Sequence, residues 1–403
     1  MRVLIYMGGG FDTYGPSRHL YHALIEDLLL QGHTVHLIEN HSTGADSDAP
    51  DDLLTFNNFS YETVSSSPVE KKAFVKRYLT GVKYCFDCIP AFKKQKGFDV
   101  MMVQSCPWAP FAISFAKKYV KIPTVWNIQD MFPGASIANG VMDKKWMQDF
   151  FYHFHKIAYR KADHISVISE DMKQKVIEQG VSPDRITVIP DWYDDKSVKE
   201  IPWEENLFVK KYNLSRDIFY VQYAGTMGFN FDYRMVVKVA ELLKGQPDIQ
   251  FQMIGFGSQK EDFERAVQEK GLTNIVFLPL EPQEMVPHVY SACSVCLIPL
   301  PRGVIGNSVP SKAGLLMACR RVIVNSVDED SDYYQMFERE QVGMSGSNMD
   351  PEAVATAILK MRDNPALREQ YAENAKVFSL GFYSRTVNTQ KHIDLLARIA
   401  CKH

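Results

Sequence analysis

Apolar runs alternate with amphipathic helical segments along most of the chain. The apolar run at residues 2–7 is followed by a helical pattern at residues 17–32, with apolar side chains on one face, and then by a second apolar run at residues 34–38. Continuous apolar runs are typical of parallel strands buried on both faces, so this order predicts a βαβ unit. The first half has further predicted strands at residues 99–104, 124–129, 164–169 and 186–190.

The pattern begins again after the polar segment at residues 191–206, which we interpret as a linker region. Apolar runs again alternate with helical segments, which predicts a second doubly wound parallel domain. Its predicted strands are residues 218–225, 249–255, 274–279, 295–300 and 321–326. Because 403 residues exceed the size of one hydrophobic core, we expect an α/β protein of two Rossmann-like domains. The expected bounds are 1–198, 199–378, and a helical segment at 379–403 that packs back on the first domain.

Glycine-rich loops follow three of the predicted strands. They lie at residues 8–10, 225–228 and 255–257. Ligands of open parallel sheets bind at the carboxyl ends of the strands, where loop N–H groups can approach an anion or a nucleotide. Tight turns without a ligand are the alternative at each loop. We expect the active site in the cleft between two facing domains.

Lys312 is an unusual choice for its position. It lies in the first turn of the helix predicted at residues 311–319, where the helix dipole makes a cation unfavourable by roughly 0.3 to 1 kcal/mol. A diphosphate bound at this helix end would turn the same placement into charge neutralisation, with the Ser311 N–H facing the same anion. A solvated lysine is the alternative.

Composition narrows the classes of function. The chain has 45 basic and 48 acidic residues, so its net charge of −3 does not favour nucleic acid as a partner. The first apolar run is too short for a signal peptide or a membrane span, and we expect a cytoplasmic protein. The seven cysteines form no regular disulfide pattern. The two C-x-x-C pairs lack the histidines of a compact zinc site, so their expected role is structural.

Seven short motifs in order make the chain resemble a GT-B glycosyltransferase of family 4. They include "LLLQGHTVHLI" near the start, then "VQYAGTMG", "MIGFGS", "NIVFLP" and "VPSKAGLLMACRRVIV". The resemblance spans nearly the whole chain. It implies two facing Rossmann-like domains, no metal or other cofactor, a nucleotide-sugar bound mainly by the second domain, and transfer with retention at the anomeric carbon.

The resemblance also implies roles for particular residues. Asp130 would orient the transferred sugar or act as a general acid or base, and Lys312 would stabilise the departing diphosphate. Capping of nearby N–H groups is the alternative role of Asp130. The residues implied at the nucleotide-sugar site are Gly9, Gly10, Gly225, Thr226, Gly257, Leu278, Leu280, Ser311 and Lys312.

Some family positions hold different residues here. The family's pair of glutamates is replaced by Asn307 and Leu315, an arginine by Thr226 and a histidine by Gln129. Either the donor is held by other side chains, such as those at residues 327–334, or the chain binds as a scaffold without catalysing. A nucleotide-sugar epimerase is a third interpretation. The expected function is a hexosyl- or N-acetylhexosaminyl-transferase that uses a UDP-sugar in polysaccharide biosynthesis.

The segment from Lys71 to Lys96 is strongly basic. It carries eight Lys and Arg against one Asp, with five aromatic residues between them. Such a surface can dock on anionic lipid, at about 1 kcal/mol for each close cation. This suits peripheral contact with the inner face of the cell membrane and a glycan or lipid-linked acceptor. A solvated basic helix over the core is the alternative.

Overall fold

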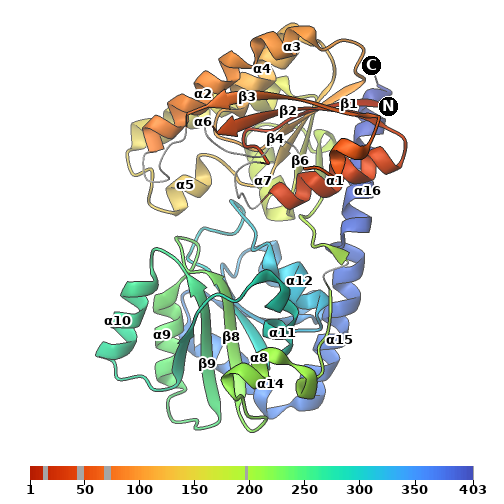
Figure 1. The fold of residues 1–403 in the computed structure, drawn as a ribbon. Helices are drawn as coiled ribbons and strands as arrows, with labels where there is room; N and C mark the ends of the chain where they lie inside the picture. The colour runs from red at the N-terminus through yellow and green to blue at the C-terminus, as the bar shows by residue number, and fades with distance from the viewer. Residues whose placement is uncertain (12–16, 43–49, 68–73, 196–197, 403) are drawn as a thin grey trace. The chain divides into compact units, whose positions relative to one another are not determined.

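The computed structural model describes residues 1–11, 17–42, 50–67, 74–195 and 198–402. The chain divides into two compact units (Figure 1). One contains Met1–Asp191 together with Asn388–His403, and the other contains Trp192–Val387.

The first unit is built on a seven-stranded sheet in the order β3-β2-β1-β4-β5-β6-β7. Every neighbouring pair is parallel, and β1 lies between β2 and β4, with Val3 opposite both Val35 and Val100. The order of the strands reverses at β1 and β4, and open α/β sheets bind ligands beside such a point. The strands are β1 (Arg2–Tyr6), β2 (Thr34–Ser42), β3 (Phe59–Ser66), β4 (Val100–Gln104), β5 (Thr124–Ile128), β6 (His164–Val167) and β7 (Ile186–Val188).

Helices follow most of these strands. Ser169 caps α7 because its hydroxyl accepts a hydrogen bond from the Met172 N–H at 3.2 Å. From Asn388 onward, the last helix belongs to this unit, where Gln390 accepts a hydrogen bond from Gln31 at 2.9 Å. The helices are α1 (Arg18–Leu30), α2 (Phe74–Asp87), α3 (Ile89–Lys94), α4 (Ala109–Tyr119), α5 (Gly134–Ala138), α6 (Lys145–Lys161), α7 (Glu170–Glu178) and α16 (Arg385–Ala400).

The second unit has a six-stranded parallel sheet in the order β10-β9-β8-β11-β12-β13. Its core contains fully buried Val221, Phe251, Phe263 and Ile358. The strands are β8 (Phe219–Thr226), β9 (Ile249–Phe256), β10 (Ile275–Leu278), β11 (Val295–Pro299), β12 (Ile323–Val327) and β13 (Gly343–Ser347). The helices are α8 (Leu207–Tyr212), α9 (Tyr233–Leu242), α10 (Lys260–Glu269), α11 (Val286–Ser291), α12 (Lys312–Ala318), α13 (Asp332–Glu340), α14 (Pro351–Asp363) and α15 (Pro365–Phe382).

The predicted fold class is confirmed. Both units are parallel α/β layers of the doubly wound type, and the predicted strands are present in both. Two further strands, β3 and β13, were not predicted from the sequence. Both lie at a sheet edge, and neither is a continuous apolar run.

Candidate functional site

The carboxyl ends of β8 and β9 are lined by glycine backbone. Gly225 lies opposite Gly255, and a Cβ atom on Gly255 would come within 2.0 Å of the Gly225 carbonyl oxygen. Gly257 follows with φ +155°, and a Cβ atom there would lie 2.2 Å from the Met227 carbonyl oxygen. Only glycine fits these positions, so the two strand ends approach each other without side chains between them.

Lys312 reaches this glycine-lined edge from the first turn of α12. Its ammonium group donates a hydrogen bond to the Ala224 carbonyl at 3.0 Å and lies 3.8 Å from the centre of the Tyr223 ring. A Cβ atom on Gly225 would be 2.6 Å from the same nitrogen. The ammonium group therefore lies directly against the end of β8.

The Lys312 ammonium group has no acidic partner in the part of the chain that the structure describes. Within the described residues no carboxylate pairs with it, whereas Lys211 and Lys270 of the same unit pair with Glu281 and Glu241. Burial lowers the pKa of Lys312 to about 8, an effect partly opposed by the Cys296 thiol. Because the ammonium group is half-buried, an anion beside it would stabilise its charged form.

The other implied donor residues lie on the same edge of the sheet. Thr226 ends β8 and is exposed, and its carbonyl accepts a hydrogen bond from the Tyr223 hydroxyl at 2.7 Å. Ser311 immediately precedes α12, and its side chain makes no capping bond. Leu278 ends β10, with Leu280 52% exposed just after it. Their contact with a nucleotide stays a prediction.

Lys260 is a residue that sequence analysis missed. It is the first residue of α10, just after the glycine loop of β9, and its ammonium group donates to the Gly255 carbonyl at 3.3 Å. A lysine in the first turn of a helix is the same anomaly that drew attention to Lys312. Two ammonium groups thus lie on the paired ends of β8 and β9.

The two residues that replace the family's glutamates make contacts within the protein. Asn307 donates to the Gly303 carbonyl at 2.8 Å, and Leu315 packs against the core. Asp328 belongs to the acidic segment considered as a substitute, but both its oxygens accept the Gly303 N–H at 3.0 Å, and Asn348 donates to it as well. Asp328 therefore holds the loop that precedes α12.

The first unit gathers a second set of predicted residues at the carboxyl edge of its own sheet. The N–H groups of Gly8 and Gly9 both donate to the Gln104 side chain, at 2.9 and 3.4 Å. A Cβ atom on Gly8 would lie 2.9 Å from Cys106, whereas one on Gly9 would meet nothing within 4 Å. Gly10 completes this loop. The backbone of Gly9 is thus open, and contact of Gly9 and Gly10 with a ligand stays a prediction.

Asp130 lies just beyond β5 and is exposed. The neighbouring Gln129 donates a hydrogen bond to Asp191 at 3.0 Å. Burial, together with the charge of Asp130, raises the pKa of Asp191 to about 7. Asp191 lies near Asp130, so the two carboxyl groups are neighbours at this edge.

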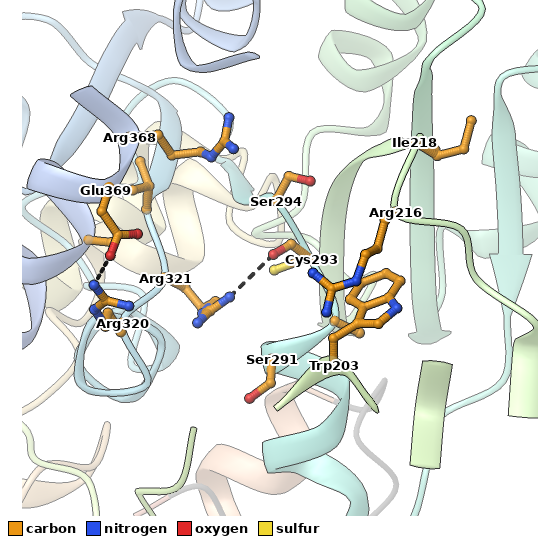
Figure 2. A pocket seen from close by; sticks show the side chains of 13 residues that line it. Trp203, Arg216, Ile218, Ser291, Cys293, Ser294, Arg320, Arg321, Arg368 and Glu369 are labelled. Atoms are coloured by element: carbon orange, nitrogen blue, oxygen red, sulfur yellow. Dashed lines mark hydrogen bonds and ion pairs between the residues drawn. The ribbon is translucent and has the colours of Figure 1, made fainter. Parts of the chain in front are cut away.

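A cavity of about 260 Å³ lies at the other edge of the second sheet (Figure 2). Residues at the amino ends of β8, β11 and β12 line it, together with four arginines. Three of the arginines pair with carboxylates: Arg216 pairs with Glu204, and Arg320 and Arg321 pair with Glu200, Glu369 and Glu373. Arg368 instead donates a hydrogen bond to the Met361 carbonyl at 2.6 Å. The arginines are Arg216, Arg320, Arg321 and Arg368. We infer that these ion pairs stabilise the fold and that the cavity is not the donor site.

Comparison with known sequences shows the family. Residues 15–192 match the family described as a glycosyl transferase 4-like domain, and residues 205–378 match glycosyl transferases group 1. The two matches together cover most of the chain, which therefore belongs to the glycosyltransferases that these two domain families describe. Among the described residues of this glycosyltransferase, no group of three or more His, Cys, Asp or Glu side chains is arranged to hold a metal ion.

Individual relatives of this glycosyltransferase are distant. WcaI of Escherichia coli strain K12, whose name describes colanic acid biosynthesis, is 25% identical over 199 residues, which are 48% of this chain. The match spans about half the length of WcaI, at 49%.

Solved structures agree in fold over the whole chain. Sucrose-phosphate synthase from Thermosynechococcus elongatus has a TM-score of 0.76 at 16% identity and covers 100% of both chains. Anabaena Alr3699/HepE, solved in complex with UDP, has a TM-score of 0.73 at 13% identity, with 99% of this chain and 100% of that chain covered. These neighbours, together with the two sheets, show the GT-B fold.

Proposed function

We propose that this protein transfers a sugar from a nucleotide diphosphate donor, with retention at the anomeric carbon. The observation that carries the proposal is the Lys312 ammonium group, which has no acidic partner among the described residues and lies against the backbone end of Gly225. A diphosphate is the anion that fits a cation beside glycine-lined strand ends. The donor site is therefore the carboxyl edge of the second sheet.

A UDP-sugar is the donor we favour, and a growing polysaccharide or lipid-linked glycan is the acceptor. HepE has been solved with UDP and with UDP-glucose, which supports the nucleotide. The name of WcaI supports polysaccharide biosynthesis. The transferred sugar is a hexose or an N-acetylhexosamine, and no metal takes part.

The mechanism is mainly electrostatic. The bond between the anomeric carbon and the diphosphate oxygen breaks, negative charge grows on the diphosphate, and Lys312 stabilises that charge. The acceptor hydroxyl then bonds to the anomeric carbon on the same face, and its proton passes to the diphosphate. Asp130 orients the sugar, and Asp191 is a neighbouring carboxyl group that can hold a proton near neutral pH.

One observation favours a second candidate, a protein that binds the donor without transferring it. Neither Asn307 nor Leu315 supplies an acidic side chain, and Asp328 is engaged in the loop before α12. A donor-binding scaffold needs the phosphate cation but not the missing carboxylates.

The two candidates are separated by measuring binding and turnover on the same preparation. A transferase is expected to bind UDP and to release UDP from one member of a panel of UDP-sugars when acceptor lipids or glycans are added. A scaffold binds UDP and releases none. Failure to bind any nucleoside diphosphate contradicts both. We further propose that the enzyme acts in the cytoplasm, at the inner face of the membrane.

A further inference from the structure

Helix α2 has two apolar faces. Tyr84 and Cys85 are buried on the face that packs on the first unit. Val75, Leu79 and Phe86 are exposed to 60, 60 and 49%. Their spacing of four and seven residues aligns them in one stripe along the helix, away from the buried face. The core explains the first face, whereas the second face is exposed apart from the contact of Phe86 with aromatic rings of α4.

Helix α6 repeats this arrangement. Phe151 is buried, whereas Trp146, Phe150 and Ile157 are exposed to 68, 57 and 37%. These three residues have the same spacing of four and seven along the helix. A second exposed apolar stripe therefore runs along α6.

Helix α4 joins the two stripes. The Phe115 ring lies 5.0 Å from that of Phe86, and the Phe111 ring lies 4.8 Å from that of Phe154. Phe154 in turn stacks on Phe150 at 6.4 Å. Helices α2, α4 and α6 lie side by side (Figure 1). We call the two stripes and the aromatic rings of α4 that join them the docking surface.

Positive charge surrounds the docking surface. Helices α2, α3, α4 and α6 carry eleven Lys and Arg against two Asp, a net charge of +9 in a chain whose total is −3. Two of these cations, Lys94 and Lys117, pair with Glu62 and Asp163 outside the four helices. Lys76 and Lys83 border the α2 stripe and line a shallow hollow with Val75 and Leu79. Residues 71–73 of the basic segment named from the sequence lie outside the described part of the chain.

We propose that the docking surface binds an anionic phospholipid bilayer, with the stripes of both α2 and α6 in the interface. Aromatic and aliphatic side chains enter the region below the headgroups, while lysines at the border meet anionic lipid. Among the described helices, none is long and apolar enough to cross a membrane. A second copy of the chain fits poorly, because two strongly positive faces repel each other.

Helix α2 also contacts the loop after β5, on the predicted acceptor side of the first unit. The rings of Phe74 and Tyr78, in the first turns of α2, lie 6.2 and 6.4 Å from the ring of Phe132. Phe132 comes two residues after Asp130, so docking brings the Asp130 loop toward the lipid surface. This suits a lipid-linked acceptor, a consequence that rests on the proposed function, whereas binding to the bilayer does not.

Sedimentation with vesicles tests the proposal without donor or acceptor. We expect the protein to bind phosphatidylcholine vesicles that contain about a third phosphatidylglycerol, and to bind pure phosphatidylcholine at least about tenfold more weakly. The variant Leu79→Ser/Phe150→Ser should bind the anionic vesicles at least about tenfold more weakly than the wild type. Leu30→Ser is the matched control, because Leu30 is 65% exposed on α1, outside the docking surface, and it should bind as the wild type does.

Tryptophan fluorescence gives a second measurement of membrane contact, and it uses the wild-type protein. Bromine-labelled lipid should quench Trp146 on binding, seen as the difference between the wild type and Trp146→Phe. Absence of binding to anionic vesicles, equal binding to neutral vesicles, wild-type binding by the double variant, or no quenching of Trp146 would each overturn the proposal. Dimers that the double variant abolishes would assign the surface to a second copy instead. If vesicle binding fails while UDP binding and turnover persist, only the docking proposal falls.

Discussion

Replacing Lys312 with alanine should weaken diphosphate binding selectively. A hydrogen bond to a charged group contributes about 1.5 to 3 kcal/mol. In the free protein the ammonium group already has the Ala224 carbonyl at 3.0 Å and the Tyr223 ring at 3.8 Å, and it gives up part of these contacts to reach a phosphate. We therefore expect a net loss of about 1.5 to 2.5 kcal/mol, which is about a ten- to seventyfold weaker affinity.

Calorimetry with two ligands isolates the role of the charge. UDP carries the diphosphate and uridine does not, so Lys312→Ala should raise the Kd of UDP by the stated factor and leave that of uridine within about twofold. Lys238→Ala is the matched control, since Lys238 is an exposed lysine on α9 of the same unit, and it should change neither Kd. An equal loss for both ligands, or no loss for either, would refute the assignment of Lys312 to the diphosphate.

Three further predictions address pH, the glycine edge and the core. Burial lowers the Lys312 pKa to about 8 and UDP binds the protonated amine, so UDP affinity should be constant between about pH 7, where the terminal phosphate of UDP is ionised, and that pKa. Above that pKa the affinity should fall by up to about tenfold per pH unit, and Lys312→Gln should show no such fall in calorimetry at several pH values. Gly225→Ala places a Cβ atom 2.6 Å from the Lys312 nitrogen and should weaken UDP binding at least about tenfold, whereas Gly9→Ala meets no atom within 4 Å and should leave thermal stability unchanged. Phe263→Ala removes a fully buried ring and should cost about 3 to 5 kcal/mol in urea unfolding; a cost below about 1 kcal/mol would contradict the packing described.

The central strands were predictable because their burial on both faces leaves a continuous apolar run. The edge strands lack that signal. Each residue of β3 is at least partly exposed, and its sequence, "FSYETVSS", is largely polar. In β13 the glycines are set by packing, since a Cβ atom on Gly343 would lie 2.3 Å from the Ile323 carbonyl and one on Gly346 would lie 2.7 Å from Val354. Contacts of this kind come from the tertiary structure and leave no periodic pattern.

Only the part of the site that has a local signal in the sequence was predictable. The anomaly of a lysine in a first helical turn is local, so Lys312 could be found from the sequence. Its partners could not, because the Ala224 carbonyl is 88 residues away along the chain. The engagement of Asp328 with Gly303 is likewise a long-range contact. The stripe on α2 escaped notice because helical periodicity shows which residues share a face and not which face the core covers.

A crystal structure of the protein with UDP would show which residues bind the diphosphate. We expect an oxygen of the diphosphate within about 3 Å of the Lys312 nitrogen, at the ends of β8 and β9. A diphosphate bound in the arginine-lined cavity at the other edge of the sheet, with Lys312 still on the Ala224 carbonyl, would contradict this expectation.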